Sequence, residues 1–212
     1  MPIPTATHVV LLPVKPPAQG KSRLASLEPG VRRRLAEAFA LDTATACFAC
    51  PSVAAVLAVT DDAVFSRALV ELGCAAIPDG VSDDLNGTLL QAVAESRRRW
   101  PSLVPAALLG DLPALRPSDL AEALAAAPAG TPAYVADADG LGTTLYTASY
   151  DEFAPRFGGG SRAAHELLGA APIAGELASL RRDVDELADL RDAAALGLGP
   201  RTAAVVADLG LL

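Results

Sequence analysis

Residues 8–14 read HVVLLPV and residues 31–49 read VRRRLAEAFALDTATACFA, with a polar loop over residues 15–24 between them. The first stretch has the length of a buried strand, and the apolar residues of the second recur with helical spacing. A strand, a loop and a helix in this order begin the unit that places parallel strands side by side. We therefore predict an α/β fold that starts at residue 8.

The same alternation continues along the chain. We predict strands at 53–60, 74–78 and 104–109, helices at 63–72 and 87–100, and a helix that begins at Pro117. Beyond residue 130 the predicted elements are strands at 133–136, 143–149 and 180–184, with one helix at 161–168. This half is expected to add an antiparallel section to the same sheet. No internal repeat or linker interrupts the pattern, so residues 1–212 are expected to form a single domain.

The composition excludes several classes of protein. Of 212 residues, 51% are hydrophobic and 20% are charged, which excludes a disordered chain. No apolar run approaches the roughly 18 residues of a membrane helix, and residues 1–5 lack a basic leader, so we expect a cytoplasmic protein without a membrane partner. The net charge of -8 argues against nucleic acid as a partner, because basic surfaces hold phosphate backbones.

The three cysteines, Cys47, Cys50 and Cys74, are odd in number and too sparse for a disulfide framework. Cys47 and Cys50 form a C-x-x-C pattern. It lies late in a predicted helix, however, and not at a helix N-terminus, where a thiolate would be stabilised. We favour buried thiols on a helix face, with a redox or zinc site as the alternative.

The loop after the first strand contains a cluster of positive charge. It holds Lys15, Lys21 and Arg23, and the first two are the only lysines among 17 basic residues. Gly20-Lys21-Ser22 imitates the end of a P-loop, but Lys15 stands where the first glycine is required and two prolines follow it, which lack amide donors. Three cations between a strand and a helix still predict an anion site, with a solvated basic loop as the alternative.

Acidic residues follow two of the predicted strands. Asp111 comes after the strand at 104–109, and Asp183 and Asp185 lie at the end of the strand at 180–184. Carboxylates from two strand ends can share a hard cation, and Mg²⁺ commonly takes one or two of them together with phosphate oxygens. With the lysine loop, these residues suggest a site for a nucleotide and its metal. For Asp111 alone, a helix cap or a solvated loop is the alternative.

Two further segments are candidates for ligand binding. Asn86 precedes the helix at 87–100, either as its N-cap or in contact with a base or ribose. Glycines 158–160 lead to Ser161 at a predicted helix start, and their uncovered backbone N–H groups could bind a second anion; a flexible turn before a Ser-capped helix is the alternative. His165, one turn further on, is expected to pack or hydrogen-bond and not to catalyse.

Together these motifs resemble the 2-phospho-L-lactate or phosphoenolpyruvate guanylyltransferases of coenzyme F-420 (deazaflavin) biosynthesis. The resemblance covers nearly the whole chain and is carried, in order, by Val14-Lys15, Gly20–Leu24, Leu85-Asn86, Gly110–Pro113, Gly142-Thr143, Arg156–Gly158, Ser161, His165 and Asp183–Asp185. It implies a Rossmann-like nucleotidyltransferase fold of the GT-A type, a three-layer sandwich around a mixed, mostly parallel sheet. The family's acidic motif usually continues Thr-Pro, whereas Glu186-Leu187 follows here, so Asp185 joins or replaces Asp183.

The resemblance also implies the reaction and the role of each residue. GMP from GTP would be joined to the phosphate of phosphoenolpyruvate with Mg²⁺ as cofactor, and the product would pass to the next transferase of the pathway. By this resemblance, Asp111, Asp183 and Asp185 would bind the metal, and Thr143, Gly158 and Ser161 would bind the acceptor. Lys15, Lys21 and Arg23 would neutralise the triphosphate as catalytic cations, and Asn86 would bind the nucleotide. Alternatives are 2-phospho-L-lactate or 3-phosphoglycerate as acceptor, a cytidylyl- or sugar nucleotidyltransferase, and a GTP sensor without turnover.

Overall fold

The computed structural model describes residues 6–14, 27–81 and 84–212, and its centre is a seven-stranded sheet with helices on both faces. The strands are β1 (His8–Pro13), β2 (Val53–Val59), β3 (Ala75–Ile77), β4 (Val104–Leu108), β5 (Ala133–Ala136), β6 (Thr143–Thr147) and β7 (Ala171–Pro172). The helices are α1 (Pro29–Ala49), α2 (Ala63–Glu71), α3 (Leu85–Arg99), α4 (Pro117–Ala126), α5 (Ser161–Leu167), α6 (Ala178–Arg181), α7 (Leu187–Leu196) and α8 (Pro200–Leu209). The predicted α/β fold is confirmed.

The order of the strands, β3-β2-β1-β4-β6-β5-β7, creates a switch point at the middle of the sheet. β1 pairs in parallel with β2 and with β4, whereas β6 is antiparallel to both of its neighbours, β4 and β5. The antiparallel section expected beyond residue 130 is therefore confirmed. The chain builds outward from β1 through β2 to β3 and then returns to β4 on the other side. Ligands of such sheets bind beyond the carboxyl ends of the strands at this point.

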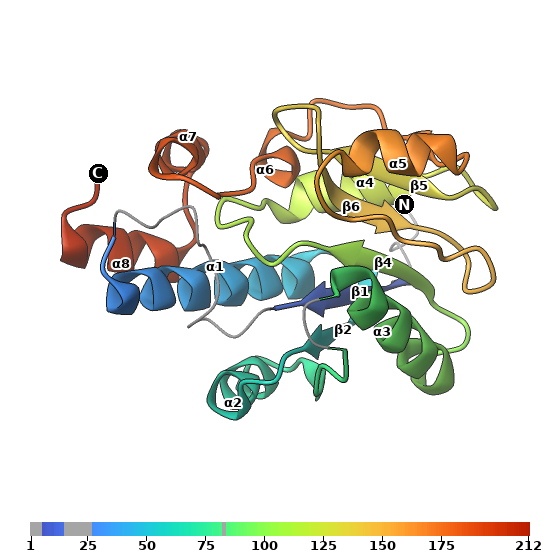
Figure 1. The fold of residues 1–212 in the computed structure, drawn as a ribbon, viewed down its shortest axis with the longest axis horizontal. Helices are drawn as coiled ribbons and strands as arrows, with labels where there is room; N and C mark the ends of the chain where they lie inside the picture. The colour runs from blue at the N-terminus through green and yellow to red at the C-terminus, as the bar shows by residue number, and fades with distance from the viewer. Residues whose placement is uncertain (1–5, 15–26, 82–83) are drawn as a thin grey trace.

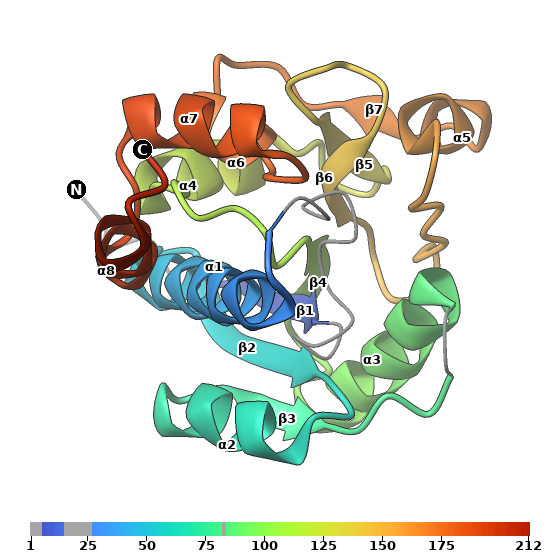
Figure 2. The same cartoon turned by 60° about the vertical axis from the view of Figure 1, so that its left-hand side comes forward.

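Each strand presents alternate residues to two different layers of helices. Val10 and Leu12 of β1 are fully buried in a cluster shared with α1, α2 and α4, whereas Val9 and Leu11 belong to a second cluster shared with α3. This division follows from the two-residue period of a strand. Figure 1 labels these helices, and the turned view in Figure 2 shows α3 on the side of the sheet away from α1. The result is a three-layer α/β sandwich.

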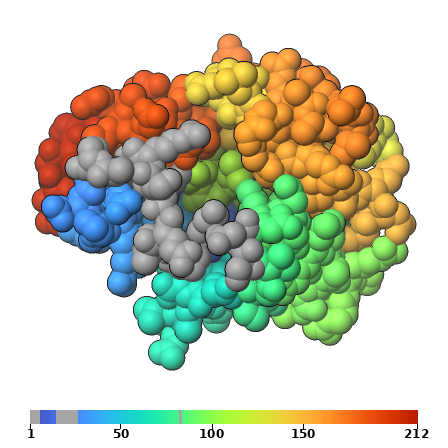
Figure 3. Space-filling model, in the orientation of Figure 1, coloured from blue at the N-terminus to red at the C-terminus, as the bar shows by residue number. Residues whose placement is uncertain are grey.

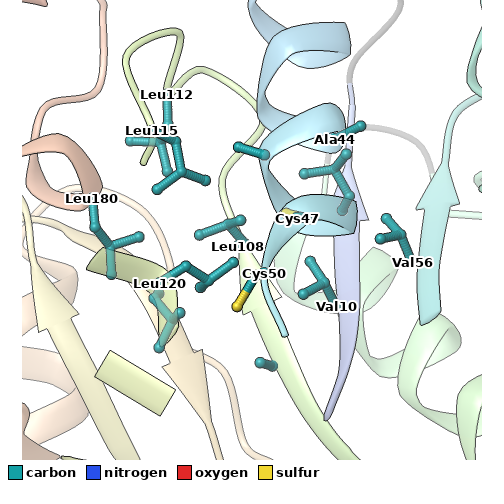
Figure 4. Close-up of a cluster of buried hydrophobic side chains, with 14 of the residues drawn as sticks. Val10, Ala44, Cys47, Cys50, Val56, Leu108, Leu112, Leu115, Leu120 and Leu180 are labelled. Carbon is teal, nitrogen blue, oxygen red and sulfur yellow. The ribbon is translucent and has the colours of Figure 1, made fainter. Parts of the chain in front are cut away.

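The three cysteines belong to the first of these clusters. Figure 4 shows Cys47 and Cys50 among its apolar side chains. Cys47, Cys50 and Cys74 are all buried and free. Burial raises the pKa of Cys74 to about 11 and raises that of Cys47 further. Thiols with raised pKa values stay protonated near neutral pH and are weak nucleophiles and metal ligands. The prediction of buried thiols is confirmed.

The segment 180–184 does not form the strand predicted for it. Its first residues belong to the short helix α6, which ends at Arg181. Leu180 and Val184 are both fully buried, but in different clusters, the first against α4 and the second beside α1 and α7. The periodicity of a short apolar run does not distinguish a buried strand from a buried helical turn. Here the apolar residues at the two ends of the segment are explained by their burial in two different hydrophobic clusters.

The patterns above do not predict α7 and α8, which follow this segment. α8 packs on α1, where the buried carboxylate of Asp42 accepts hydrogen bonds from the N–H groups of Arg201 (3.2 Å) and Thr202 (2.8 Å). The side chain that caps α8 therefore comes from a distant part of the chain, which local sequence cannot reveal. Among the described residues, none of the helices has both the length and the apolar character needed to cross a bilayer.

Candidate active site

A cavity of about 650 Å³ lies at the edge of the sheet where β4 and β5 end and β6 begins. Because β6 runs antiparallel to its neighbours, its first residues stand beside their last ones. Six residues predicted for the site line this cavity: Asp111, Thr143, Gly158, Ser161, Asp183 and Asp185. In Figure 3 a hollow is visible near the centre of the face shown, bordered by the orange and red parts of the chain.

Asp111 lies in the turn that follows β4, and its neighbours anchor this turn. Leu112 is fully buried, and its N–H donates a hydrogen bond of 3.2 Å to the hydroxyl oxygen of Thr43 on α1. The carbonyl oxygen of Asp111 accepts a hydrogen bond of 3.1 Å from the N–H of Val184. This backbone contact brings together the two acidic segments that the sequence pattern predicted to share a site.

Asp183 and Asp185 flank the fully buried Val184 and line the same cavity. The N–H of Asp185 donates to the carboxylate of Asp189 at 3.0 Å, within a capping box at the start of α7. Asp189 also pairs with Arg182 at 3.2 Å. The acidic segment is therefore held by a buried side chain and a helix cap, in place of the strand that was predicted. The sequence analysis missed Arg182 and Asp189, although both lie within four residues of the acidic pair.

Acidic side chains dominate the cavity. Its lining includes seven of them: Asp111, Asp137, Asp139, Asp183, Asp185, Glu186 and Asp189. Among the described lining residues Arg182 is the one cation, and carboxylates already pair with it at 3.2 and 3.4 Å. An anionic ligand would be repelled here without additional positive charge. The predicted cations Lys15, Lys21 and Arg23 follow β1 in the chain, but lie outside the described residues.

The carboxylates fit a hard divalent cation. All are oxygen donors, and neither Cys nor His is among the described residues that line the cavity. In the described part of the chain, no three His, Cys, Asp or Glu side chains are grouped as a metal site. Mg²⁺ commonly needs only one or two protein carboxylates, because water and phosphate oxygens complete its octahedron. The donor set therefore fits an ion that enters together with a phosphorylated ligand.

Asp137 holds the loop that places Gly142 and Thr143 at the cavity. Its carboxylate accepts hydrogen bonds from the N–H groups of Leu141 (2.9 Å) and Gly142 (2.7 Å). A Cβ atom at Gly142 would collide with this carboxylate, so glycine is required here by close approach. The sequence analysis missed Asp137; an Asp-x-Asp-Gly turn just before a strand was the available signal.

Asn86 holds the segment that leads into the glycine turn. Its amide group donates to the carbonyl oxygen of Phe157 at 3.0 Å and accepts from the N–H of Phe157 at 2.8 Å. The N-cap of α3 is Asp84, so the interpretation of Asn86 as the N-cap is wrong. Asn86 does not belong to the described lining, although Phe157 does. Its contact with a nucleotide stays a prediction.

The glycine turn exposes backbone to the cavity. Gly158 and Gly160 have φ values of 130° and 71°, in the region that favours glycine, and a Cβ atom on either would meet nothing within 4 Å. Ser161 follows as the first residue of α5, is buried, and donates its N–H to the carbonyl oxygen of Gly158 at 3.1 Å. Gly160 is the N-cap, so the alternative of a Ser-capped helix is wrong.

His165 is fully buried behind the wall formed by Thr143 and the glycine turn. Its Nε2 accepts a hydrogen bond from the N–H of Arg156 at 2.9 Å, and its Nδ1 lies 3.1 Å from the hydroxyl oxygen of Thr143. Burial lowers the pKa of His165 to about 4, and the charge of Arg156 acts in the same direction. The lowered pKa favours a neutral imidazole near pH 7. The burial of the ring and its two hydrogen bonds confirm the expectation that His165 packs and hydrogen-bonds.

Comparison with known proteins identifies the family to which the sequence is similar. A family model described as guanylyl transferase CofC like matches residues 8–169. A phosphoenolpyruvate guanylyltransferase from Thermomonospora curvata is 47% identical over 203 residues, covering 95% of this chain and 89% of its own length. The enzyme of the same name from Streptomyces coelicolor is 48% identical over 203 residues, covering 94% and 96%.

Solved structures share the fold at lower identity. A nucleotidyl transferase from Methanothermobacter superposes with a TM-score of 0.64 at 19% identity, covering 90% of this chain and 97% of its own. A protein from Mycobacterium tuberculosis in complex with manganese has a TM-score of 0.50 at 17% identity, covering 88% and 98%. Since the family model and close relatives both span most of the sequence, this chain belongs to the CofC-like guanylyl transferase family.

Proposed function

We propose that this protein is a phosphoenolpyruvate guanylyltransferase. It joins the GMP unit of GTP to the phosphate of phosphoenolpyruvate, releases pyrophosphate and forms enolpyruvyl-diphospho-guanosine. The observation that carries the proposal is the convergence of six predicted site residues on one cavity at the carboxyl edge of the sheet. The names of the two relatives from Thermomonospora and Streptomyces support phosphoenolpyruvate as the acceptor.

The acceptor is assigned to the side of the cavity formed by Thr143, Gly158 and Ser161. This side offers hydroxyl groups and uncovered glycine backbone, and its imidazole neighbour carries no charge near pH 7. Phosphoenolpyruvate carries a phosphate and a carboxylate, and anionic oxygens accept strong hydrogen bonds from such donors. These three residues therefore bind and orient the acceptor without bringing a further negative charge toward it.

The metal is assigned to Asp111 with Asp183 or Asp185. Their carboxylates line one cavity and their segments are joined by the bond from the N–H of Val184 to the carbonyl oxygen of Asp111. We infer Mg²⁺ because the donors are carboxylates and GTP brings the remaining oxygen ligands. When bound, such an ion supplies positive charge against the phosphate oxygens.

The nucleotide is assigned to the loop that follows β1. Lys15, Lys21 and Arg23 neutralise the triphosphate, since the described lining offers a single, already paired arginine for that task. Lysine is suited to it as a compact point charge. Asn86 contributes at the start of α3, where it also fixes the backbone of Phe157.

The chemistry requires no general base. A phosphate monoester with a second pKa near 6 is mostly dianionic at neutral pH and is already a nucleophile. One acceptor phosphate oxygen forms a bond to the α-phosphorus of GTP while the bond from that phosphorus to the bridging oxygen of pyrophosphate breaks. The residues of the site align the two anions and neutralise the charge on the leaving group, which are the main sources of catalysis in such transfers.

The test is pyrophosphate release by the full chain with Mg²⁺, GTP and one acceptor at a time. Phosphoenolpyruvate is expected to react fastest, with 2-phospho-L-lactate and 3-phosphoglycerate as competitors and CTP in place of GTP as the nucleotide control. Faster turnover of another acceptor, or of CTP, would show that the assigned substrate is wrong. Binding of GTP without pyrophosphate from any acceptor would identify a sensor and overturn the proposal.

We place the reaction in the cytoplasm, a compartment that keeps cysteines such as these three reduced. We also propose that residues 1–212 form one domain. The product is a nucleotide-activated phosphoacid whose diphosphate bond can drive a second transfer. We therefore propose that it passes to the next transferase of coenzyme F-420 biosynthesis. The observation that supports this step is the family to which the chain belongs.

A further inference from the structure

The imidazole of His165 joins two walls of the cavity. Its Nε2 is 2.9 Å from the backbone nitrogen of Arg156, two residues before the glycine turn, and its Nδ1 is 3.1 Å from Thr143 Oγ1 at the start of β6. The ring stacks on Tyr146, with ring centres 4.6 Å apart, and meets Phe157 edge-on at 5.4 Å. Both hydrogen-bonded neighbours are therefore held by a ring that is itself immobilised by aromatic packing.

These two contacts determine where the imidazole carries its proton. A backbone N–H can only donate, so Nε2 must be the unprotonated nitrogen that accepts from Arg156. A neutral imidazole then carries its proton on Nδ1, and this N–H donates to the hydroxyl oxygen of Thr143. The pKa of about 4 for His165 agrees, because the neutral ring dominates near pH 7.

The tautomer also determines what Thr143 can do. A hydroxyl has one proton to donate, and its oxygen is the acceptor for the Nδ1–H of His165. Within the described part of the chain, Thr143 Oγ1 has no other hydrogen bond, and Thr143 lines the cavity. Its proton is therefore available for an acceptor atom of a ligand.

We propose that His165 is a positioning residue that makes the Thr143 hydroxyl a hydrogen-bond donor directed at an anionic oxygen of the phosphoacid acceptor. The inference rests on the proposed function, which assigns the acceptor to this wall of the cavity. It adds a residue that is outside the described lining of the cavity and acts on the acceptor through Thr143. The groups that face the ring are Thr143, Arg156, Phe157, the backbone of Ser161 and the two tyrosines Tyr134 and Tyr146.

The first test measures the tautomer and does not depend on catalytic activity. The chain has only two histidines, so protein labelled with ¹⁵N-histidine gives two imidazole spin systems, and a His8→Gln variant assigns them. At pH 7.5 we expect His165 to be neutral, with a protonated Nδ1 and an unprotonated Nε2. A proton on Nε2, either alone or in an imidazolium ion, would overturn the proposal.

The second test separates acceptor binding from folding. Thr143→Val is expected to raise the KM for phosphoenolpyruvate about tenfold, the effect of one hydrogen bond to an anion, and to leave the KM for GTP within about twofold. Thr143→Ser restores the hydroxyl and is expected to restore the wild-type KM. The matched control is Thr147→Val, because Thr147 is an equally buried threonine of β6 that bonds to the carbonyl oxygen of Pro105, outside the described lining.

His165→Gln completes a double-mutant cycle with Thr143→Val. If His165 acts through Thr143, the double variant has the phosphoenolpyruvate KM of Thr143→Val alone, because the shared contact can be lost only once. Additive effects, or equal changes in both KM values, would overturn the positioning role. If His165→Gln does not fold, the tautomer measurement decides. If the wild type releases no pyrophosphate from GTP and phosphoenolpyruvate, the proposed function fails while the tautomer result stands independently.

Discussion

At the scale of single residues, neighbouring residues and the backbone of Asp111 make contacts that hold the turn after β4. Leu112 is buried against α1, and the carbonyl oxygen of Asp111 accepts the N–H of Val184. An isosteric change of the carboxylate to an amide leaves both of these contacts in place. A substitution of the side chain should therefore change the chemistry of the cavity without dismantling the turn.

Asp111→Asn is expected to lower nucleotidyl transfer by about a hundredfold or more while the fold is retained, since an amide is a poor ligand for a hard cation. Steady-state pyrophosphate release and circular dichroism measure the two effects. Asp151→Asn is the control, because Asp151 is an exposed acid that pairs with Arg97 at 2.7 Å, outside the described lining. Near-normal turnover by folded Asp111→Asn would contradict the metal assignment.

Ser161→Ala is expected to raise the KM for phosphoenolpyruvate roughly tenfold and to raise the KM for GTP much less, because one hydroxyl donor to an anion is lost. Ser96→Ala provides a buried serine for comparison, since its hydroxyl bonds to Tyr150 at 2.8 Å and Ser96 is not among the described lining residues. Equal effects of Ser161→Ala on the two KM values would remove Ser161 from the acceptor side.

At the scale of elements, two side chains of α3 make the same kind of contact to different loops. Asn86 exchanges two hydrogen bonds with the backbone of Phe157. Gln91 accepts from the N–H of Gly80 at 2.9 Å and donates to the carbonyl oxygen of Pro78 at 3.1 Å. Only the first contact ties α3 to a residue of the cavity. Substitutions of Asn86 and Gln91 can therefore distinguish an effect on the stability of α3 from an effect on the placement of the glycine turn.

Asn86→Ala and Gln91→Ala are each expected to lower the free energy of unfolding by about 1–3 kcal/mol, because each removes two hydrogen bonds to backbone. Only Asn86→Ala should also raise the KM for phosphoenolpyruvate, since the segment before Gly158 loses its anchor. Urea unfolding and kinetics at varied phosphoenolpyruvate concentration provide the comparison. Unchanged kinetics in folded Asn86→Ala would show that Asn86 supports α3 alone.

At the scale of the whole molecule, the acid sensitivity of folding reflects the neutral imidazole in the core. The pKa of His165 is about 4 in the folded protein, against an ordinary value of 6.5. Between these values the unfolded chain binds a proton that the folded chain does not, so stability falls as the pH falls. The contribution of the neutral ring is complete above pH 6.5 and is lost toward pH 4.

We expect His165→Gln to lose stability less steeply than the wild type between pH 7.5 and 4.5, by about 2 kcal/mol in the free energy of unfolding. Urea titrations at the two pH values measure the difference. Some acid sensitivity should persist in the variant, because burial also lowers the pKa of His8. Parallel pH profiles for the two proteins would contradict a buried, neutral His165.

The sequence by itself determined the layered fold and most of the candidate residues. Alternation of strands and helices is a local property of apolar periodicity, and it predicted β1 through β4 with their helices. The acidic residue after β4 identified Asp111, because strand ends share one edge of a sheet. The glycines before a predicted helix start identified Gly158 and Ser161 as a possible anion site. The resemblance of the motifs to a family then added Thr143 and the reaction.

The tertiary structure alone decided how distant segments complete the cavity. Leu180 and Val184 fit a strand by local pattern, but burial in two separate clusters makes the segment a helical turn and a tether for Asp183 and Asp185. The same holds for Asn86 on the backbone of Phe157 and for His165 between two walls. Such contacts join residues far apart in the chain, and hydrogen bonding between them depends on the packed core that brings them within reach.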